Sequence, residues 1–260
     1  MKWEKQAIII TGSTRGIGKS TAKQLAQQGA AVVVNGRQEE CVNETVDEIR
    51  KSGGRAVGVV GCVTDKNVGQ QLVDAAVEKF GTVTTLINNA GIIRDKMSYK
   101  MKLEEFEEVI DVHVKGTFFT TQPVVQQMRK QGSGGLILNM TSQAGLVGTV
   151  GQVNYSAAKA GILGMTWTLA KELEKDAIQV NAISPAALTD MTRPVIEKAQ
   201  QHAEQKGETL PDYWKIGSVD DVTNYIIDFI TFPKCRRSGE VYAVNGKEIG
   251  RWLPPSYEML

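Results

Sequence analysis

Short apolar runs that alternate with longer helix-like segments constrain the fold of this chain more than any other feature. The runs are continuously apolar, as expected for strands of a parallel sheet that is covered on both faces. The segments between them show helical spacing and end near glycines, which commonly stop helices. We expect strands at 7–10, 31–34, 56–60, 84–87, 136–140, 179–183 and 240–244, and helices at 19–28, 38–51, 65–79 and 103–130.

Repeated strand-helix-strand units predict a single α/β domain of the doubly wound Rossmann type over residues 1–260, with a seven-stranded parallel sheet and helices on both faces. Ligands of such sheets bind beyond the carboxyl ends of the strands. The polar segment 186–217 contains Pro194 and Pro211 and is long for a connection between a strand and a helix. We interpret this segment as a substrate lid.

The charge balance and the cysteines exclude several classes of function. Thirty basic residues nearly balance 29 acidic ones, which gives no electrostatic reason to expect binding to nucleic acid or to an anionic membrane. Cys41, Cys62 and Cys235 are odd in number and widely spaced, which disfavours a disulfide framework and a zinc site. No stretch approaches the roughly 18 apolar residues of a membrane span. We therefore expect a cytoplasmic protein, without a metal, that acts on a small molecule.

A glycine-rich turn directly follows the first expected strand. It contains Gly12, Thr14, Gly16, Ile17 and Gly18 and leads into a helix. Glycines let the backbone approach a pyrophosphate, and the exposed N–H groups and the helix dipole attract it. The G-x-x-x-G-x-G spacing alone would also fit an ordinary turn, but its position after the first strand favours a phosphate-binding site.

The end of the second strand indicates which cofactor is used. An NAD-specific site would place an Asp or Glu there, about 20 residues beyond the glycines, and this acid is missing from Asn35-Gly36-Arg37. Arg15 and Arg37 instead offer two guanidinium groups that could converge on a 2′-phosphate. We predict NADP(H) as the cofactor; the alternative is that both arginines are solvated surface residues.

Three side chains in the second half of the chain suggest proton transfer. Ser142 ends the fifth strand, and Tyr155 and Lys159 lie four residues apart on one face of the next helix. A lysine ammonium beside a tyrosine hydroxyl would lower the tyrosine pKa from about 10 toward the working pH, as a general acid requires. A Tyr-x-x-x-Lys pair alone is common on ordinary helices, so it carries weight only with the other motifs.

Together, the glycine turn, Asn88-Asn89-Ala90-Gly91, Ser142, Tyr155 and Lys159 resemble the short-chain dehydrogenase/reductase family over nearly the whole chain. The resemblance implies that Tyr155 donates a proton to a carbonyl oxygen, that Ser142 orients this oxygen, and that Lys159 tunes Tyr155 and holds the nicotinamide ribose. It also implies a homodimer or homotetramer packed through the helices at 103–130 and around residue 159. The other cofactor contacts that we assign by this resemblance are Val63, Asn89, Ala90, Gly91 and Leu188.

Three positions depart from the pattern of the family. Cys62 stands where many relatives carry an Asp that accepts a hydrogen bond from adenine, and Ala186 stands where glycine is usual. His113 stands at the position of a fourth catalytic member, an Asn that holds a water linking the lysine to solvent. Because imidazole also donates and accepts hydrogen bonds, we expect His113 to be catalytic and to titrate near pH 6.5. The alternative is a packed histidine without a role.

The substrate is left open by these motifs. The pattern is most similar to the bacterial 3-oxoacyl-[acyl-carrier-protein] reductases, which implies reduction of a β-keto thioester by NADPH. A reductase or dehydrogenase of a free ketone, steroid, sugar or secondary metabolite fits comparably, because the lid at 186–217 sets specificity. A non-catalytic NADP-binding sensor is a remote alternative, since Ser142, Tyr155 and Lys159 are all present.

Overall fold

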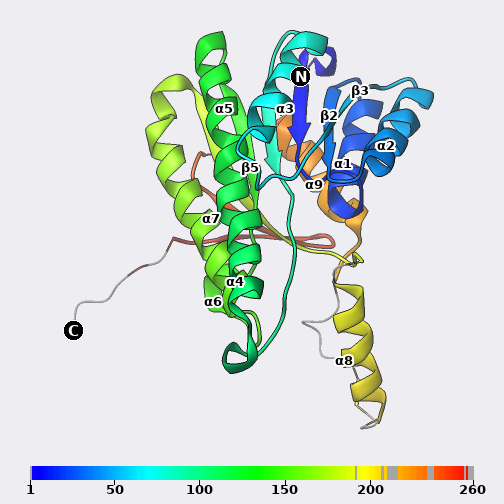
Figure 1. Cartoon of the computed structure of the whole chain (residues 1–260), viewed down its shortest axis with the longest axis vertical. Helices are drawn as coiled ribbons and strands as arrows, with labels where there is room; N and C mark the ends of the chain where they lie inside the picture. Colours follow the sequence, from blue (N-terminus) through cyan, green and yellow to red (C-terminus); the bar gives the residue numbers. More distant parts are fainter. Residues whose placement is uncertain are drawn as a thin grey trace.

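The computed structural model describes residues 2–190, 192–205, 208–209, 216–232, 237–254 and 256. Strands and helices alternate along the chain as predicted (Figure 1). In chain order the elements are η1 (Trp3–Lys5), β1 (Ala7–Ile10), α1 (Gly16–Gln27), β2 (Ala31–Gly36), α2 (Glu39–Lys51), β3 (Arg55–Val60), α3 (Val68–Phe80), β4 (Thr85–Asn88), η2 (Ser98–Lys100), α4 (Leu103–Ile110), η3 (Asp111–Lys115), α5 (Gly116–Gln131), β5 (Gly135–Met140), α6 (Ala144–Val147), α7 (Val153–Glu172), η4 (Glu174–Asp176), β6 (Ile178–Ala186), α8 (Arg193–Gln205), α9 (Val219–Thr231), β7 (Val241–Asn245) and β8 (Glu248–Trp252).

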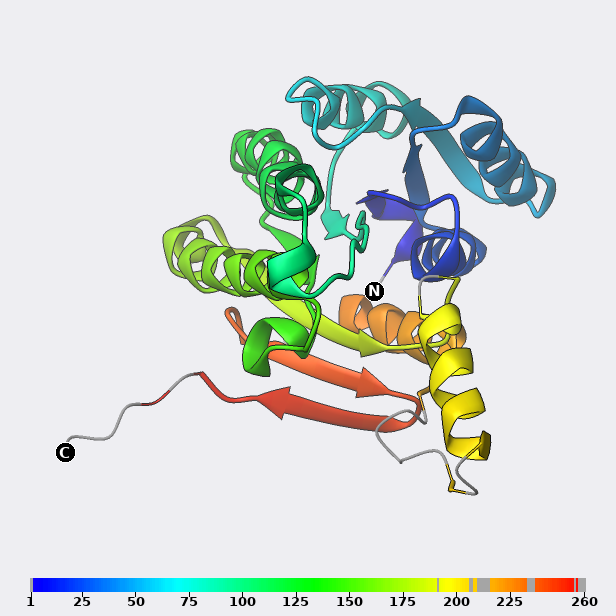
Figure 2. The same ribbon diagram turned by 60° about the horizontal axis from the view of Figure 1, so that its bottom comes forward.

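The strands form one sheet in the order β3-β2-β1-β4-β5-β6-β7-β8. Strands β1 to β7 pair in parallel, which confirms the Rossmann-type prediction. The predicted count of seven strands is wrong, because β8 adds an eighth, antiparallel to β7 at the edge of the sheet (Figure 2). The chain runs outward from β1 to β3 and then returns to place β4 on the other side of β1. The crevice that binds ligands in such sheets is therefore expected between β1 and β4.

Successive residues of β1 enter two different cores. Ile8 and Ile10 pack with residues of α1, α2 and α9, whereas Ile9 packs with residues of α3, α5 and α7. Side chains alternate across a strand, so this division places helices on both faces of the sheet. The continuously apolar runs of the sequence are explained by this double covering.

The segment 103–130, predicted as one helix, is interrupted. Helix α4 ends at Ile110, a π-helical turn occupies Asp111–Lys115, and α5 continues from Gly116. A π turn inserts an extra residue into the helical repeat and is frequent at functional sites. His113 lies at the centre of this turn and is only 1% exposed.

The segment 186–217, predicted as a lid, contains helix α8. Figure 1 shows α8 projecting from the body of the molecule, and it follows the carboxyl end of β6. Ala187 and Gly217 form a backbone bridge, so the segment leaves and rejoins the body at one place. Met191, Pro211 and Cys235 lie outside the described residues. Within the described ranges, none of the helices combines the length and the apolar character that crossing a bilayer requires.

Candidate active site

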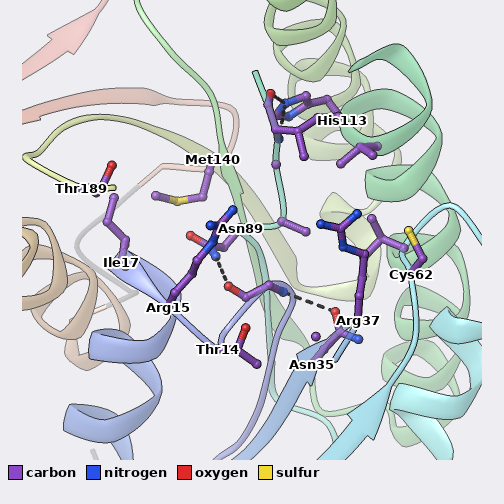
Figure 3. A pocket seen from close by; sticks show the side chains of 18 of the residues that line it. Thr14, Arg15, Ile17, Asn35, Arg37, Cys62, Asn89, His113, Met140 and Thr189 are labelled. Carbon is purple, nitrogen blue, oxygen red and sulfur yellow. Dashed lines mark hydrogen bonds between the residues drawn. The ribbon is translucent and has the colours of Figure 1, made fainter. Parts of the chain in front are cut away.

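A cavity of about 620 Å³ lies where the strand order reverses between β1 and β4 (Figure 3). Its wall combines the glycine turn, the end of β2, the loop after β4, the π turn and the first half of α7. Gly18, Ser142 and Leu188 do not line this wall. The other predicted cofactor and catalytic residues do, namely Gly12, Thr14, Arg15, Gly16, Ile17, Arg37, Val63, Asn89, Ala90, Gly91, His113, Tyr155 and Lys159.

The glycine turn is held tightly against the loop after β4. Asn89 Nδ2 donates to Gly12 O at 2.9 Å and to Thr11 O at 3.0 Å. A Cβ atom on Gly18 would lie 2.5 Å from Asn89 Nδ2, and one on Gly12 would lie 2.8 Å from Ala90 Cα. Gly12 also has a φ of +61°, which L side chains rarely adopt. The absence of a side chain at Gly18 therefore lets α1 pack closely against Asn89, and Gly18 itself does not line the cavity.

Asn35 is a residue that the sequence analysis passed over. It is 1% exposed, and its Oδ1 accepts from Gly12 N at 3.3 Å. Its Nδ2 donates to Val59 O at 3.1 Å and to Gly61 O at 3.2 Å. One buried amide thus joins the glycine turn to the end of β3. The sequence did contain a clue to this role, because an Asn near the end of an otherwise apolar strand is expected to be buried and a buried polar group needs hydrogen-bond partners.

Arg15 and Arg37 fit the phosphate of a dinucleotide. Both are exposed, and both line the cavity, Arg15 from the glycine turn and Arg37 from beyond β2 (Figure 3). Neither forms an ion pair with another described residue. Two uncompensated guanidinium groups beside a glycine turn that can admit a pyrophosphate form a donor set suited to a phosphorylated cofactor.

Cys62 and Ala186 are the two other positions that depart from the family pattern. Cys62 lines the cavity with Cys41, and its Sγ accepts from Thr64 Oγ1 at 3.1 Å. Ala186 ends β6 and pairs with Asn245 of β7. Among the described residues, Ala177 is the one non-glycine with a positive φ, so Ala186 avoids the conformations that favour glycine.

Tyr155 and Lys159 line the cavity, and Ser142 lies beside Tyr155 without lining it. The side chain of Ser142 forms a hydrogen bond with that of Tyr155. Lys159 Nζ donates to Met140 O at 2.7 Å and lies 5.4 Å from the centroid of the Tyr155 ring. The ammonium group therefore lies over the ring, with one of its protons committed to the end of β5.

Burial dominates the electrostatics of this group. It raises the pKa of Tyr155 to about 12, against a smaller lowering effect of the Ser142 hydrogen bond and a raising effect of the Asp95 charge. Burial also lowers the pKa of Lys159 to about 7. The expected lowering of the Tyr155 pKa is not seen in this structure, because desolvation of the phenolate is the largest influence on this pKa and raises it. At neutral pH Tyr155 carries its proton, as a proton donor must.

His113 contacts the loop after β4 and the ring of Tyr155, the candidate proton donor. Its Nε2 lies 2.8 Å from Ile92 O and 3.2 Å from Ile92 N, and its ring stands edge-on to Tyr155 at 5.3 Å between centroids. Its Nδ1 is buried and has no hydrogen-bond partner among the described residues. A Cβ on Gly91 would lie 2.5 Å from His113 Cε1, so glycine at 91 makes room for the imidazole.

The expectation that His113 titrates near pH 6.5 is wrong. Burial first, and the positive charge of Lys159 second, lower the pKa of His113 to about 3. A hydrogen bond donated by Nε2–H to Ile92 O opposes this effect only in part. The imidazole is therefore neutral at physiological pH and acts as a fixed hydrogen-bonding group.

The sequence profile of the short chain dehydrogenases matches residues 6–200 of this chain. The chain belongs to the short-chain dehydrogenase family. As a member, it is an oxidoreductase that acts on C=O or CH–OH groups. Within this short-chain dehydrogenase, most residues of the family motif line the cavity, and the exceptions are Gly18, Asn88 and Ser142.

Curated relatives align over nearly their whole length. The chain is 46% identical to a 3-oxoacyl-[acyl-carrier-protein] reductase of Synechocystis sp. over 244 residues, which cover 93% of this chain and 96% of the relative. It is 37% identical to a 3-oxoacyl-[acyl-carrier-protein] reductase of Thermotoga maritima over 247 residues, covering 95% and 98%. Among solved structures, a short chain dehydrogenase from Mycobacterium avium matches with a TM-score of 0.85 at 33% identity, covering 100% of this chain and 89% of that one.

Proposed function

We propose that this short-chain dehydrogenase is an NADP(H)-dependent reductase of 3-oxoacyl thioesters. The observation that carries the proposal is one cavity lined by Tyr155 and Lys159 and also by Arg15 and Arg37, with Ser142 hydrogen-bonded to Tyr155. The glycine turn forms part of the cavity wall, as it does in a dinucleotide site. Ser142 and Tyr155 can polarise a carbonyl and deliver a proton to it.

The chemistry divides between cofactor and protein. Bound NADPH supplies the hydride that reduces the carbonyl carbon. The Ser142 hydroxyl orients the carbonyl oxygen, and the Tyr155 hydroxyl donates its proton to that oxygen as negative charge develops there. Lys159, with a pKa of about 7, can exchange protons with its surroundings near neutral pH and so restore the proton to Tyr155. In the reverse direction the same groups accept the proton from an alcohol.

The choice of NADP over NAD rests on Arg15 and Arg37. Both guanidinium groups are exposed at the cavity wall, where the family's adenosine half binds, and the residues 35–37 offer no carboxylate to a free ribose hydroxyl. Guanidinium groups bind phosphates with charge-assisted bonds, so the 2′-phosphate of NADP should increase affinity. Gly18 and Leu188 lie outside the wall, and we assign their contribution to packing around the cofactor.

The substrate class is inferred from the relatives. Both curated relatives described above are named as 3-oxoacyl-[acyl-carrier-protein] reductases. The second candidate is a reductase of free ketones, since segment 186–217 is expected to set specificity as a lid and contains the protruding helix α8. We place the protein in the cytoplasm, where its cofactor and acyl thioesters are found.

Steady-state kinetics test the proposal directly. Purified enzyme with NADPH or NADH is offered a 3-oxoacyl thioester or a panel of free ketones, and oxidation of the nicotinamide is followed by absorbance. The proposal expects the highest kcat/KM for the thioester with NADPH. A higher value for a free ketone would favour the second candidate, and absence of turnover with every substrate would refute reductase activity.

His113 is proposed as a positioning residue of the same site. Its Nε2 fixes the Ile92 peptide beside the cavity, and its neutral Nδ1 can accept a hydrogen bond from a water near Lys159.

Self-association is proposed through the exposed faces of α5 and α7. Phe118 is 45% exposed there, and a side chain on Gly164 would meet no atom within 4 Å, so this glycine does not serve packing within the chain.

A further inference from the structure

Two thiols line the cavity that we assign to the cofactor. Cys41 belongs to the first turn of α2, and Cys62 follows the end of β3. Both are free and partly exposed, so a solute that enters the cavity can reach them. The proposed reduction uses neither of them. Their position therefore raises the question of which other chemistry they support.

Cys62 lies at the same end of the cavity as Arg37. Gly61 N donates to Gly36 O at 2.9 Å, and Asn35 Nδ2 donates to Gly61 O at 3.2 Å. The first bond joins the residue before Cys62 to the residue before Arg37, and Figure 3 shows both side chains on one part of the wall. The end of the second strand faces the adenosine ribose in dinucleotide sites of this kind. A group attached to Cys62 would therefore occupy the space of the adenosine half.

The cavity attracts anions. Its charged lining residues are three basic side chains, Arg15, Arg37 and Lys159, and one acidic side chain, Asp190. Arg15 and Arg37 have no ion-pair partner among the described residues. Guanidinium groups bind carboxylates with the same forked geometry that they use for phosphates. A small solute that carries carboxylates is therefore drawn to the wall that holds the two thiols.

The hydrogen bonds of the two thiols distinguish them. The Sγ atom of Cys62 accepts from Thr64 Oγ1 at 3.1 Å, whereas the Sγ atom of Cys41 donates to Gln38 Oε1 at 3.4 Å. The thiolate is the form that attacks a disulfide, and a thiolate accepts hydrogen bonds but cannot donate them. Cys62 therefore keeps its bond when it reacts, while Cys41 loses its own. Cys41 also directly follows the two glutamates that open α2.

We propose that Cys41 and Cys62 form a thiol-modification site within the cofactor cavity, which an anionic disulfide of low molecular weight modifies only while the cofactor is absent, with Cys62 reacting first. The thiolate of Cys62 attacks one sulfur of the disulfide, so the old S–S bond breaks and a mixed disulfide forms on the protein. The other half leaves as a thiolate and takes up the proton that Cys62 released. The inference rests on the proposed function, because it requires that NADP(H) occupy this cavity.

Oxidised glutathione is the probe that tests this inference. The reduced protein is incubated with it in the presence and absence of NADPH, and the mass of the intact chain and of its cysteine peptides is followed over time. We expect one glutathionyl group on Cys62, loss of NADPH binding in the modified protein, and recovery of binding after reduction by dithiothreitol. NADPH at about ten times its Kd leaves about one-eleventh of the protein free, so it should slow the modification roughly ten-fold.

Matched variants identify the thiol that reacts. Cys62→Ser should reduce the rate of modification roughly ten-fold or more, since it removes the nucleophile. Cys41→Ser removes a thiol from the same cavity and should retain most of the rate and the protection by NADPH. Modification of Cys41 in preference to Cys62, or at neither position, would overturn the inference.

The charge of the disulfide provides a second comparison. The rate with oxidised glutathione and the rate with cystamine, a cationic disulfide, are each divided by the rate of the same reagent with free cysteine. The ratio should be higher for oxidised glutathione, and raising the ionic strength should bring the two ratios together. An equal or higher ratio for cystamine at low ionic strength would contradict attraction by the arginines.

Binding of NADPH to the unmodified protein is measured separately by nicotinamide fluorescence, so that the two proposals can fail independently. If NADPH binds but does not slow the modification of Cys62, the inference is overturned and the proposed function stands. If NADPH does not bind, the proposed function falls and the inference falls with it.

Discussion

Replacing His113 with Asn should make the folded protein less sensitive to acid. The imidazole is 1% exposed, and burial together with the charge of Lys159 lowers its pKa from 6.5 to about 3. The folded protein therefore holds this histidine in its neutral form, whereas the unfolded chain protonates it in mildly acidic solution. Asn has no such proton equilibrium and can still hydrogen-bond to the Ile92 peptide.

The size of the effect follows from the two pKa values. Because the unfolded chain binds the proton more tightly, the free energy of unfolding is independent of this group above a pH of about 6.5 and falls as the pH decreases toward about 3. Each pKa unit corresponds to about 1.4 kcal/mol, so the complete loss approaches about 5 kcal/mol. At a pH of about 5, the unmodified protein should have lost about 2 kcal/mol through His113.

Urea unfolding followed by circular dichroism measures this difference. The free energy of unfolding is determined near neutral pH and near pH 5, as bounded by the two pKa values above, at one fixed protein concentration because assembly also affects stability. His113→Asn should lose about 2 kcal/mol less than the unmodified protein between the two conditions. His202→Asn is the matched control, because it removes the chain's other histidine and retains His113. Equal losses in all three proteins would refute the assignment of a neutral, buried His113.

In activity assays, His113→Asn should remain active and His113→Phe, which has no polar group, should be slower.

Four further changes test other parts of the site and the assembly. Tyr155→Phe should reduce turnover by about 100-fold or more while cofactor binding, followed by nicotinamide fluorescence, is retained; turnover of more than a few per cent would require another proton donor. Arg37→Asp should weaken NADPH binding by about 1–3 kcal/mol and leave NADH binding nearly unchanged, and calorimetry that shows equal loss for both cofactors would contradict a phosphate contact. Gly91→Ala should destabilise the protein by roughly 1–3 kcal/mol through overpacking against His113, and the loss should be smaller in the His113→Asn background if the contact is the cause. If the chain self-associates through α7 as proposed, Gly164→Glu should reduce the sedimenting mass without affecting the fold, whereas an unchanged oligomeric mass would show that Gly164 lies outside the interface.

The sequence predicted those elements whose burial is uniform. Strands such as β1 and β2 were located because both of their faces are covered, which produces runs such as Ala7–Ile10 without polar interruptions. Strand β8 was missed because four of its five residues, Glu248 to Arg251, are exposed and show no apolar run. The π turn at Asp111–Lys115 was missed because one additional residue in a long helix hardly alters its apolar periodicity.

The candidate site was predictable where a role depends on a residue type at a fixed spacing. Glycines in a turn and the pair Tyr155 and Lys159 are of this kind, and the fold brings them to one cavity. The role of Asn35 depends on partners that are distant in the chain, such as Gly12 and Val59. No spacing rule connects these pairs, so only the folded chain identifies them.

The pKa of Tyr155 is raised although Lys159 lies close to it, so the proximity of a positive charge is not enough to predict the direction of the shift. Helical spacing correctly places Lys159 near the tyrosine ring, 5.4 Å from its centroid. The same burial that makes the site useful for catalysis also removes water from the phenolate and from the ammonium, so it disfavours both charged forms. The result is a tyrosine that keeps its proton at neutral pH beside a lysine that titrates there. Such a pair is prepared to give a proton to a carbonyl oxygen and to regain it from the neighbouring lysine.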